Sequence, residues 1–408
     1  MRVIYRCVFF VSIFFALFPA VAVHADNGPL KFTSSTQFMW GDDVLGNSQA
    51  IIAQYLRFSY RPEGKHGFSI AGYGRIWDDL DSGSIRDTDF NGRLYYLYLD
   101  YSPIDEVSMR LGRQYVNLAA GSSMMDGATL NFHPPGLLGL TVTAGRDVIF
   151  TLDSESSREG NYFVGFDVQL QKVKNVQLGV SYVMKYDDSD LSREEFGLNA
   201  RYIYKWIIPY AQLRYDWLSK AIDEATIGVN LLPVKDLALK AEFFHSYPTF
   251  DSTSIFSVFA VNKFREYLFS AEYSLPKSPF TFFGQYRRQT YDDESNADVF
   301  AMGTKVFPND KLSFGASVDY SHSYDDRNWG FEVTGDYRAS QKFLLAAGVQ
   351  YNAYQRPDDA GNRSAQRYWV GGKWHATKNM DVAVRVEDNA NETFNHRTLG
   401  RLTLNWKL

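Results

Sequence analysis

From about Leu30 to the final Leu408, apolar and polar residues alternate in segments that are separated by turns. In residues 195–202, for example, Phe, Leu, Ala and Tyr alternate with Glu, Gly, Asn and Arg. A period of two is the period of a β-strand, because successive side chains point to opposite faces. Strands that repeat over a whole chain predict an all-β wall with one apolar and one polar face. A transmembrane antiparallel up-and-down β-barrel has such a wall.

The first residues have the pattern of a secretory signal peptide. Arg2 and Arg6 form a positive start, an apolar run follows, and the run ends at a Val-His-Ala cleavage site. The rival interpretation, an N-terminal membrane anchor, is disfavoured because the apolar run is short for a span and contains Pro19. We therefore expect a cleaved signal peptide at 1–25. No linker or low-complexity tract follows, so one outer-membrane barrel domain is expected over 26–408.

The composition removes several classes of function. The single cysteine, Cys7, lies inside the predicted signal peptide, so the mature chain is expected to have no disulfide, thiolate metal site, cysteine nucleophile or attached c-type haem. Without Arg2 and Arg6, 40 basic residues face 47 acidic ones, and this balance disfavours nucleic acid as a partner. No apolar stretch after the signal is long enough for a transmembrane helix.

Aromatic residues are abundant, with 27 Tyr and 31 Phe, and they are spread through the alternating segments. Such spacing is typical of the aromatic girdles that flank the apolar band of an outer-membrane barrel. We therefore predict that outer-membrane lipid surrounds the wall and that the protein lies in the outer membrane of a Gram-negative bacterium.

The connections between segments fall into two alternating sets. One set is short and often basic or proline-containing, at residues 62–65, 103–105, 134–136, 172–175, 233–236, 276–279, 308–310 and 377–379. The other set is longer and acidic, at residues 78–89, 153–159, 187–191, 292–295, 325–327 and 356–364. Outer-membrane barrels have short periplasmic turns and longer extracellular loops, which assigns the two sets to the two sides.

Segmentation of the pattern predicts about 22 strands, and 18 to 22 remain open because the boundaries near Trp206 and Ala221 are weak. Transporters with 22 strands usually hold a plug in the lumen, and we expect no plug domain before this barrel. A wide barrel without a plug is either an open pore or is filled by loops or by another protein.

The last segment alternates Leu402, Leu404, Trp406 and Leu408 with polar residues. We expect this strand to close the barrel against the first strand, which removes a long exposed edge. Outer-membrane barrels commonly end on such a strand, usually with Phe, and the assembly machinery of the outer membrane is the expected partner of this strand. The final Leu408 departs mildly from that pattern.

The two faces of the predicted strands differ in charge. Charge is nearly absent from the apolar phase, as a barrel surface requires, since a charge at the bilayer midplane costs about 2–4 kcal/mol. The opposite phase carries acidic and basic residues that a dry core would not accommodate. Transverse salt-bridge ladders are the ordinary role for most of them, and the mixed signs assign no ion selectivity. The pore-lining candidates are Arg57, Arg75, Arg110, Arg113, Asp126, Arg201, Arg214, Asp216, Glu242, Arg287 and Arg385.

One stretch resembles a known family. Leu111-Gly112-Arg113-Gln114 is followed by Met125-Asp126-Gly127-Ala128, a spacing similar to that of gated or substrate-specific porins, including the alginate-export type. The resemblance implies a strongly basic pore, from which the mixed charges here depart. Strict alternation puts Arg113 in the lipid phase, so either a bulge at Gly112 turns it inward or it lies at the outer rim. The segment 117–124 is small enough to fold into the lumen.

Three functions remain open. The first is a channel for small polar solutes, and the second is a scaffold barrel that encloses a multihaem cytochrome for electron transfer across the outer membrane. The third is an enzyme or adhesin at the rim, for which His322 with Ser321, Ser323 and Asp325 is the nearest grouping. We expect no enzyme and no cofactor, because no phosphate-binding Gly loop, metal-binding His pair or nucleotide fingerprint is present.

Overall fold

The computed structural model describes residues 28–43, 46–62, 64, 67–81, 91–150, 155–156, 160–247, 263–292, 295–323, 326–356 and 359–407. The predicted signal peptide at 1–25, with Cys7, lies outside the described residues and stays a prediction, and so do Asp325 and most of the connection at 78–89. Within the described part of the chain, no helix has the length and apolarity needed to cross a bilayer.

Twenty-two strands form one sheet, and two short strands form a second. The first half of the chain contributes β1 (Leu30–Asp42), β2 (Ser48–Tyr60), β3 (Gly67–Asp79), β4 (Asn91–Ile104), β5 (Val107–Leu118), β6 (Gly121–Phe132), β7 (Leu138–Asp147), β8 (Ile149–Phe150), β9 (Glu155–Ser156), β10 (Tyr162–Leu170), β11 (Val176–Asp187) and β12 (Asp190–Tyr202). The second half contributes β13 (Ile207–Asp216), β14 (Ala221–Val234), β15 (Leu237–Ser246), β16 (Phe264–Ser274), β17 (Phe280–Tyr291), β18 (Asn296–Asn309), β19 (Leu312–Ser323), β20 (Asp326–Arg338), β21 (Phe343–Arg356), β22 (Asp359–His375), β23 (Met380–Ala390) and β24 (Arg397–Lys407).

The large sheet closes on itself. Each strand pairs antiparallel with the next along the chain, and β7 pairs with β10 because β8 and β9 pair only with each other. The last strand, β24, pairs with β1 from Thr33–Lys407 to Gly41–Leu399. The predicted closure and the predicted number of strands are therefore confirmed. The two weak boundaries are real, since β13 begins at Ile207 and β14 at Ala221.

The outward face of the sheet explains the alternation in the sequence. Large apolar side chains such as Ile227, Met302 and Val370 are about 60% exposed, which is unusual for a water-facing surface. In a membrane these exposed apolar side chains are expected, because the apolar band of a barrel faces hydrocarbon. Each strand of the ring is hydrogen-bonded to a neighbour on both sides, as a span in lipid requires.

The two ends of the barrel differ in their connections. The end that holds the start of β1 and the finish of β24 has tight turns, such as those between β4 and β5 and between β14 and β15. The opposite end holds the long connections between β7 and β10 and between β15 and β16. Some predicted long loops are short, however. β11 ends at Asp187 and β12 begins at Asp190, so two residues connect strands where 187–191 was expected to loop.

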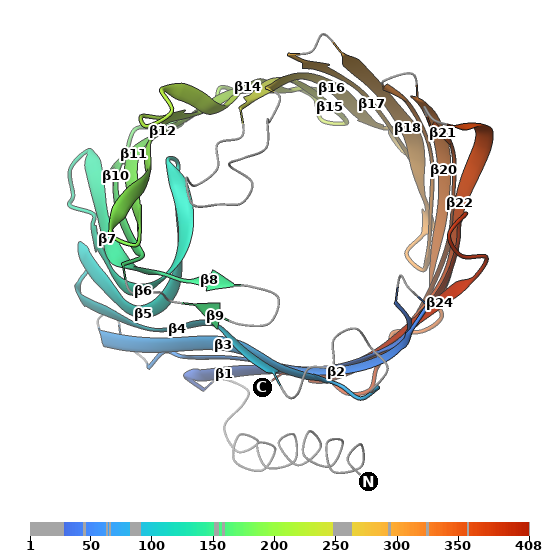
Figure 1. Ribbon diagram of the computed structural model, residues 1–408, viewed down its shortest axis with the longest axis horizontal. Coiled ribbons are helices and arrows are strands. Elements are labelled where there is room, and N and C mark those ends of the chain that lie inside the picture. The colour runs from blue at the N-terminus through green and yellow to red at the C-terminus, as the bar shows by residue number, and fades with distance from the viewer. Residues whose placement is uncertain are drawn as a thin grey trace.

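The strands form a ring in Figure 1, viewed along the barrel. The small hairpin of β8 and β9 lies inside the ring, and the tip of the β5–β6 hairpin curves inward beside β10, β11 and β12. These two elements determine how the lumen is shaped on that side.

Candidate pore lining and constriction

The register defines which side chains face the lumen, because residues directly opposite one another in an antiparallel ladder share a face. Arg57 lies opposite Thr33 on β1 and Tyr73 on β3, while its neighbours in the chain join the apolar rows. We call the face that carries Arg57 the inner face. Following it from strand to strand round the ring assigns an inner or an outward position to every paired residue.

Nine of the eleven predicted pore-lining residues lie on the inner face by this register. They are Arg57, Arg75, Arg110, Arg201, Arg214, Asp216, Glu242, Arg287 and Arg385. They are spread round the ring rather than gathered at one site. Arg214 and Asp216 are two residues apart on β13, and Arg57 and Arg75 lie on the neighbouring strands β2 and β3.

Arg113 and Asp126 do not lie on the inner face, where pore-lining residues were expected. Arg113 lies opposite Leu97 on β4 and Asp126 on β6, in the outward phase. Its guanidinium makes a bidentate ion pair with Asp126, with both N–O distances 2.8 Å. Its Nη1 also donates to the carbonyl of Leu94 at 3.1 Å. No register shift occurs at Gly112, so the bulge that would have turned Arg113 inward is absent from β5.

The position of Arg113 is explained by the end of the β4–β5 ladder. Pairing between these strands stops at Arg113, and β6 stops pairing with β7 at Met125. Beyond this row the β5–β6 hairpin leaves the wall. At this point the Arg113 side chain donates a hydrogen bond to the carbonyl of Leu94. The ion pair therefore stabilises the point at which the sheet divides.

A row of glycines lies beside this point. Gly112, Gly127 and Gly145 are directly opposite one another on β5, β6 and β7. Gly112 has a φ of +119°, and a Cβ on it would lie 2.4 Å from the carbonyl oxygen of Leu97. A Cβ on Gly127 would lie 2.2 Å from the carbonyl oxygen of Ala144. Only glycine fits such close backbone approaches, so this glycine row allows the wall to bend sharply.

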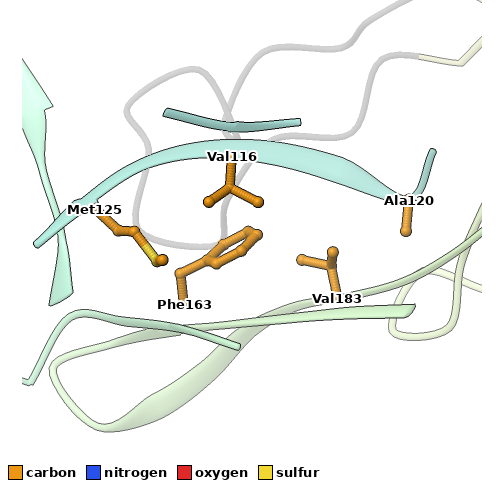
Figure 2. Close-up of a cluster of buried hydrophobic side chains, with 5 residues drawn as sticks. All are labelled: Val116, Ala120, Met125, Phe163 and Val183. Atoms are coloured by element: carbon orange, nitrogen blue, oxygen red, sulfur yellow. The ribbon is translucent and has the colours of Figure 1, made fainter. Parts of the chain in front are cut away.

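Beyond the glycine row, the hairpin tip packs against the inner face of β10 and β11. Val116, Ala120 and Met125 from the hairpin surround Phe163 and Val183, and all five side chains are buried (Figure 2). The amide of Ala120 donates a 2.6 Å hydrogen bond to Ser181 Oγ. The prediction that 117–124 folds into the lumen is confirmed, although the segment is a packed hairpin rather than a free loop.

A group of charged side chains supports the docked tip from β12 to β14. Glu195 is 1% exposed and lies 3.3 Å from Arg193 and 3.8 Å from Arg214. Arg214 also pairs with Asp223 at 2.6 Å and with Glu224 at 2.7 Å. Buried charges are tolerated when they are paired in this way, and removing one partner costs about 3–5 kcal/mol. We assign these residues a structural role in supporting the hairpin tip.

The inner face of β2, β3 and β4 carries stacked tyrosines. The ring centroids of Tyr55 and Tyr73 are 6.4 Å apart, and those of Tyr73 and Tyr95 are 4.8 Å apart. Both pairs are nearly parallel, and Tyr96 and Tyr98 continue the series along β4 at 5.5 Å. Aromatic faces that line a wall can contact flat or ring-shaped solutes without being specific for one molecule.

Arginines lie over these aromatic rings. The guanidinium of Arg75 is 4.0 Å from the ring centre of Trp77, and that of Arg110 is 4.0 Å from Tyr98. Arg93 lies 5.0 Å from Phe150, which comes from β8 inside the ring. The cation–π contacts hold the guanidinium groups flat against the wall. The β8–β9 hairpin is thus anchored to β4 by the same kind of contact.

The charges of the inner face are segregated. On β24 and β1 to β5, the described inner-face residues include eight basic and two acidic side chains. The basic ones are Lys31, Arg57, Arg75, Arg93, Arg110, Arg397, Arg401 and Lys407, and the acidic ones are Asp79 and Asp100. We call this part of the ring the basic wall.

Across the lumen, acidic residues outnumber basic ones on the described inner face of β12 to β20. The acidic ones are Asp190, Glu195, Asp216, Glu224, Glu242, Glu266, Glu272, Asp319, Glu332 and Asp336. The basic ones are Arg193, Arg201, Arg214, Lys240, Arg287, Lys305 and Arg338. Basic and acidic residues are therefore unevenly distributed over the inner face of the described strands.

One cavity of about 650 Å³ lies on the basic wall. Its lining contains two cations, two tyrosines and no carboxylate. The lining residues are Thr33, Ser35, Gln37, Tyr55, Arg57, Tyr73 and Lys407. Arg57 and Lys407 meet here only because β24 closes against β1, which joins the two ends of the chain. Sequence reasoning included Arg57 and missed Lys407 and both tyrosines.

No protein-family model matches the chain, and no curated protein sequence matches it. Among solved structures, the siderophore receptor PirA from Pseudomonas aeruginosa is similar, with 11% identity, a TM-score of 0.62, and coverage of 94% of this chain and 80% of that one. This chain has the fold of a Gram-negative outer-membrane β-barrel.

Two further solved structures share that fold. A variant of the ferric enterobactin receptor PfeA from Pseudomonas aeruginosa has 12% identity and a TM-score of 0.62, over 94% of this chain and 81% of that one. OccAB2 from Acinetobacter baumannii has 12% identity and a TM-score of 0.50, over 94% of this chain and 98% of that one. At these identities the likeness shows the outer-membrane barrel fold and nothing finer.

Proposed function

We propose that this chain forms a channel in the outer membrane of a Gram-negative bacterium through which small polar solutes pass. The observation that carries the proposal is the inner face of the closed barrel, which is polar, accessible and divided into a basic wall and a more acidic one. A wall built only to hold the fold together has no need for charges that are exposed to the lumen.

The accessibility of these charges supports a water-filled lumen. The side chains of Arg367, Glu332 and Arg385 are 39%, 43% and 44% exposed, although they point into the ring. Charged groups with this much exposure are solvated rather than packed. The described elements inside the ring, the β5–β6 tip and the β8–β9 hairpin, lie against the wall rather than across it (Figure 1).

The separation of charge is expected to make the channel prefer solutes that carry a negative group. Opposed walls of unlike sign set up a field across the lumen, and low-dielectric walls focus it. A solute with a carboxylate is drawn to the basic wall, where tyrosine rings such as Tyr55 and Tyr73 offer faces for contact. Small polar solutes that carry a negative group are therefore the solutes that this lumen favours.

The two receptors with similar folds suggest an alternative, a transporter of siderophore complexes. Transporters with 22 strands have plugged lumens. In the part of this chain that the structure describes, the elements inside the ring are the two short hairpins, and neither is a plug domain. This observation supports a channel over a receptor.

Nothing among the described residues favours a barrel that encloses a multihaem cytochrome or an enzyme at the rim. The side chains of His322 and Ser321 lie on opposite faces of the wall, because the register places His322 outward and Ser321 inward. No group of three metal-binding side chains is present within the described residues.

Solute release from liposomes tests the proposal. Purified protein is reconstituted with entrapped glucose, glucuronate or glucosamine, which are similar in size and differ in charge. We expect all three to leave the liposomes, with glucuronate released fastest relative to its leak from protein-free liposomes. Heat-unfolded protein is the control. Retention of all three solutes at the protein-free rate would contradict the proposal.

A further inference from the structure

The outward face of β16 to β20 carries a row of aromatic side chains. The register places Phe269, Tyr286, Phe300, Tyr320 and Trp329 directly opposite one another on the five strands. The rings of Tyr286 and Phe300 stack with centroids 4.7 Å apart. On the lipid face of a barrel, aromatic residues are typical of the girdles that flank the apolar band.

One row further toward the end that holds the long connections, the same face becomes charged. Arg288, Asp298, His322 and Arg327 follow one another on β17 to β20. Arg265 lies one row beyond Tyr267 on β16. The side chains of Arg265, Arg288, His322 and Arg327 are all exposed. We call Arg265, Arg288 and Arg327 the rim patch.

The charge of the rim patch is not balanced locally. Asp298 is the single acidic residue in these rows among the described residues, and it accepts a 2.6 Å hydrogen bond from Tyr286 Oη. It lies 3.8 Å from Arg288. Neither Arg265 nor Arg327 has a carboxylate within ion-pair distance in the described part of the chain. Within these two rows, three guanidinium groups thus face one carboxylate.

The depth of a charged residue in the bilayer decides how well it is tolerated on the outward face of a barrel. A charge on the lipid face is costly at the midplane of the bilayer and becomes tolerable only near the interface. Long arginine side chains extend from the aromatic row into the headgroup layer. There the planar guanidinium matches the oxygens of a phosphate group in a bidentate geometry. The end with long connections is the extracellular one, so the headgroups belong to the outer leaflet.

We propose that the rim patch binds the phosphate groups of the phosphorylated glycolipid in the outer leaflet. The aromatic row contacts the sugar and the start of the acyl chains, and Arg265, Arg288 and Arg327 hold the phosphates. This site lies on the outside of the wall and is independent of what passes through the lumen.

Binding of purified lipid A to the protein in detergent tests the proposal, with the diphosphorylated and the fully dephosphorylated forms as probes. We expect the diphosphorylated form to bind more tightly to the wild type. The triple variant Arg265→Gln, Arg288→Gln and Arg327→Gln should bind it about tenfold more weakly or worse. The matched control is Arg57→Gln, Arg201→Gln and Arg401→Gln, which removes three exposed arginines from the inner face and should leave the affinity unchanged.

Two further measurements are needed. The first identifies the lipid that supplies the phosphate, and the second excludes misfolding as the cause of weaker binding. Phosphatidylglycerol in the same detergent should compete poorly with lipid A, and equal competition would overturn the choice of glycolipid. Asp298→Asn removes the one acid of the patch and should tighten the binding of diphosphorylated lipid A, a gain that a misfolded protein cannot show. Equal binding of both lipid A forms, or an unchanged affinity in the rim triple variant, would overturn the proposal.

Discussion

At the scale of single residues, the inner face contains two kinds of cation. Arg214 forms ion pairs with Glu195, Asp223 and Glu224, and these carboxylates neutralise its charge within the wall. Arg57 and Lys407 share a cavity that no carboxylate lines. A cation of the second kind contributes its charge to the lumen, because no acidic side chain of the described residues lines its cavity.

Arg57→Glu is expected to lower the preference of the channel for anions. The substitution reverses one charge in the acid-free cavity, so the ratio of anion to cation permeability should fall by about twofold or more. The reversal potential in a KCl gradient across a planar bilayer measures this ratio. Lys311→Glu, in the turn between β18 and β19, is the control and should change it little. An unchanged ratio for Arg57→Glu would show that the basic wall has no influence on permeation.

The buried side chain of Phe163 should matter for stability rather than for permeation. It is fully buried between the hairpin tip and the wall, so Phe163→Ala leaves a cavity and should cost about 3–5 kcal/mol. Urea unfolding in micelles measures the loss. Phe166→Ala, on the outward face of the same strand, is 40% exposed and should cost less. Equal losses for the two variants would contradict the packing of the tip.

At the scale of elements, the β5–β6 hairpin is the part that most shapes the lumen. Its tip lies so close to β12 that a Cβ on Gly197 would be 2.0 Å from the amide nitrogen of Ala120. Backbone atoms cannot move aside cheaply at that distance, so a side chain at this position must displace the tip.

Gly197→Ala is therefore expected to undock the hairpin. The result should be larger current fluctuations in single-channel records and faster proteolysis within 117–124, with the barrel itself intact. Gly179→Ala is the matched control, because its Cβ would meet only the flexible side chain of Asn199 on the same inner face. If both variants behave like the wild type, the tip does not rest on β12 as described.

The hairpin also shows where sequence reasoning succeeded and where it stopped. The small residues of 117–124 correctly indicated a segment that enters the lumen. The alternation placed Arg113 in the lipid phase, and the register places it there as well. The glycine row could not be recognised, since Gly112, Gly127 and Gly145 come together only when three strands are in register.

At the scale of the whole molecule, the wall, its closure and its strand number were predictable from the sequence. A period of two is a local property of the sequence. It determines which side chains of a strand share a face, whichever strands lie beside it. The division into a basic and a more acidic wall was not predictable. It depends on which strands are adjacent, including β24 and β1, which lie at opposite ends of the chain.

The closing strand gives a test of the barrel as a membrane protein. Leu404 on β24 faces outward and pairs with Thr36 and Val382. Leu404→Arg places a charge on the lipid face and should cost about 2–4 kcal/mol if the position lies near the midplane of the bilayer. The fraction of protein that migrates fast without heating on a gel should fall. Thr403→Arg, its inner-face neighbour, should keep that fraction, and an equal effect of both changes would contradict the assigned faces.

The central claim is that water and small solutes cross the membrane through this barrel. Single-channel recording of the purified protein in a planar bilayer tests it most directly. The claim predicts steady, stepwise conductance in KCl that disappears after heat unfolding. An inserted, correctly folded barrel that passes no current at any applied voltage would contradict it.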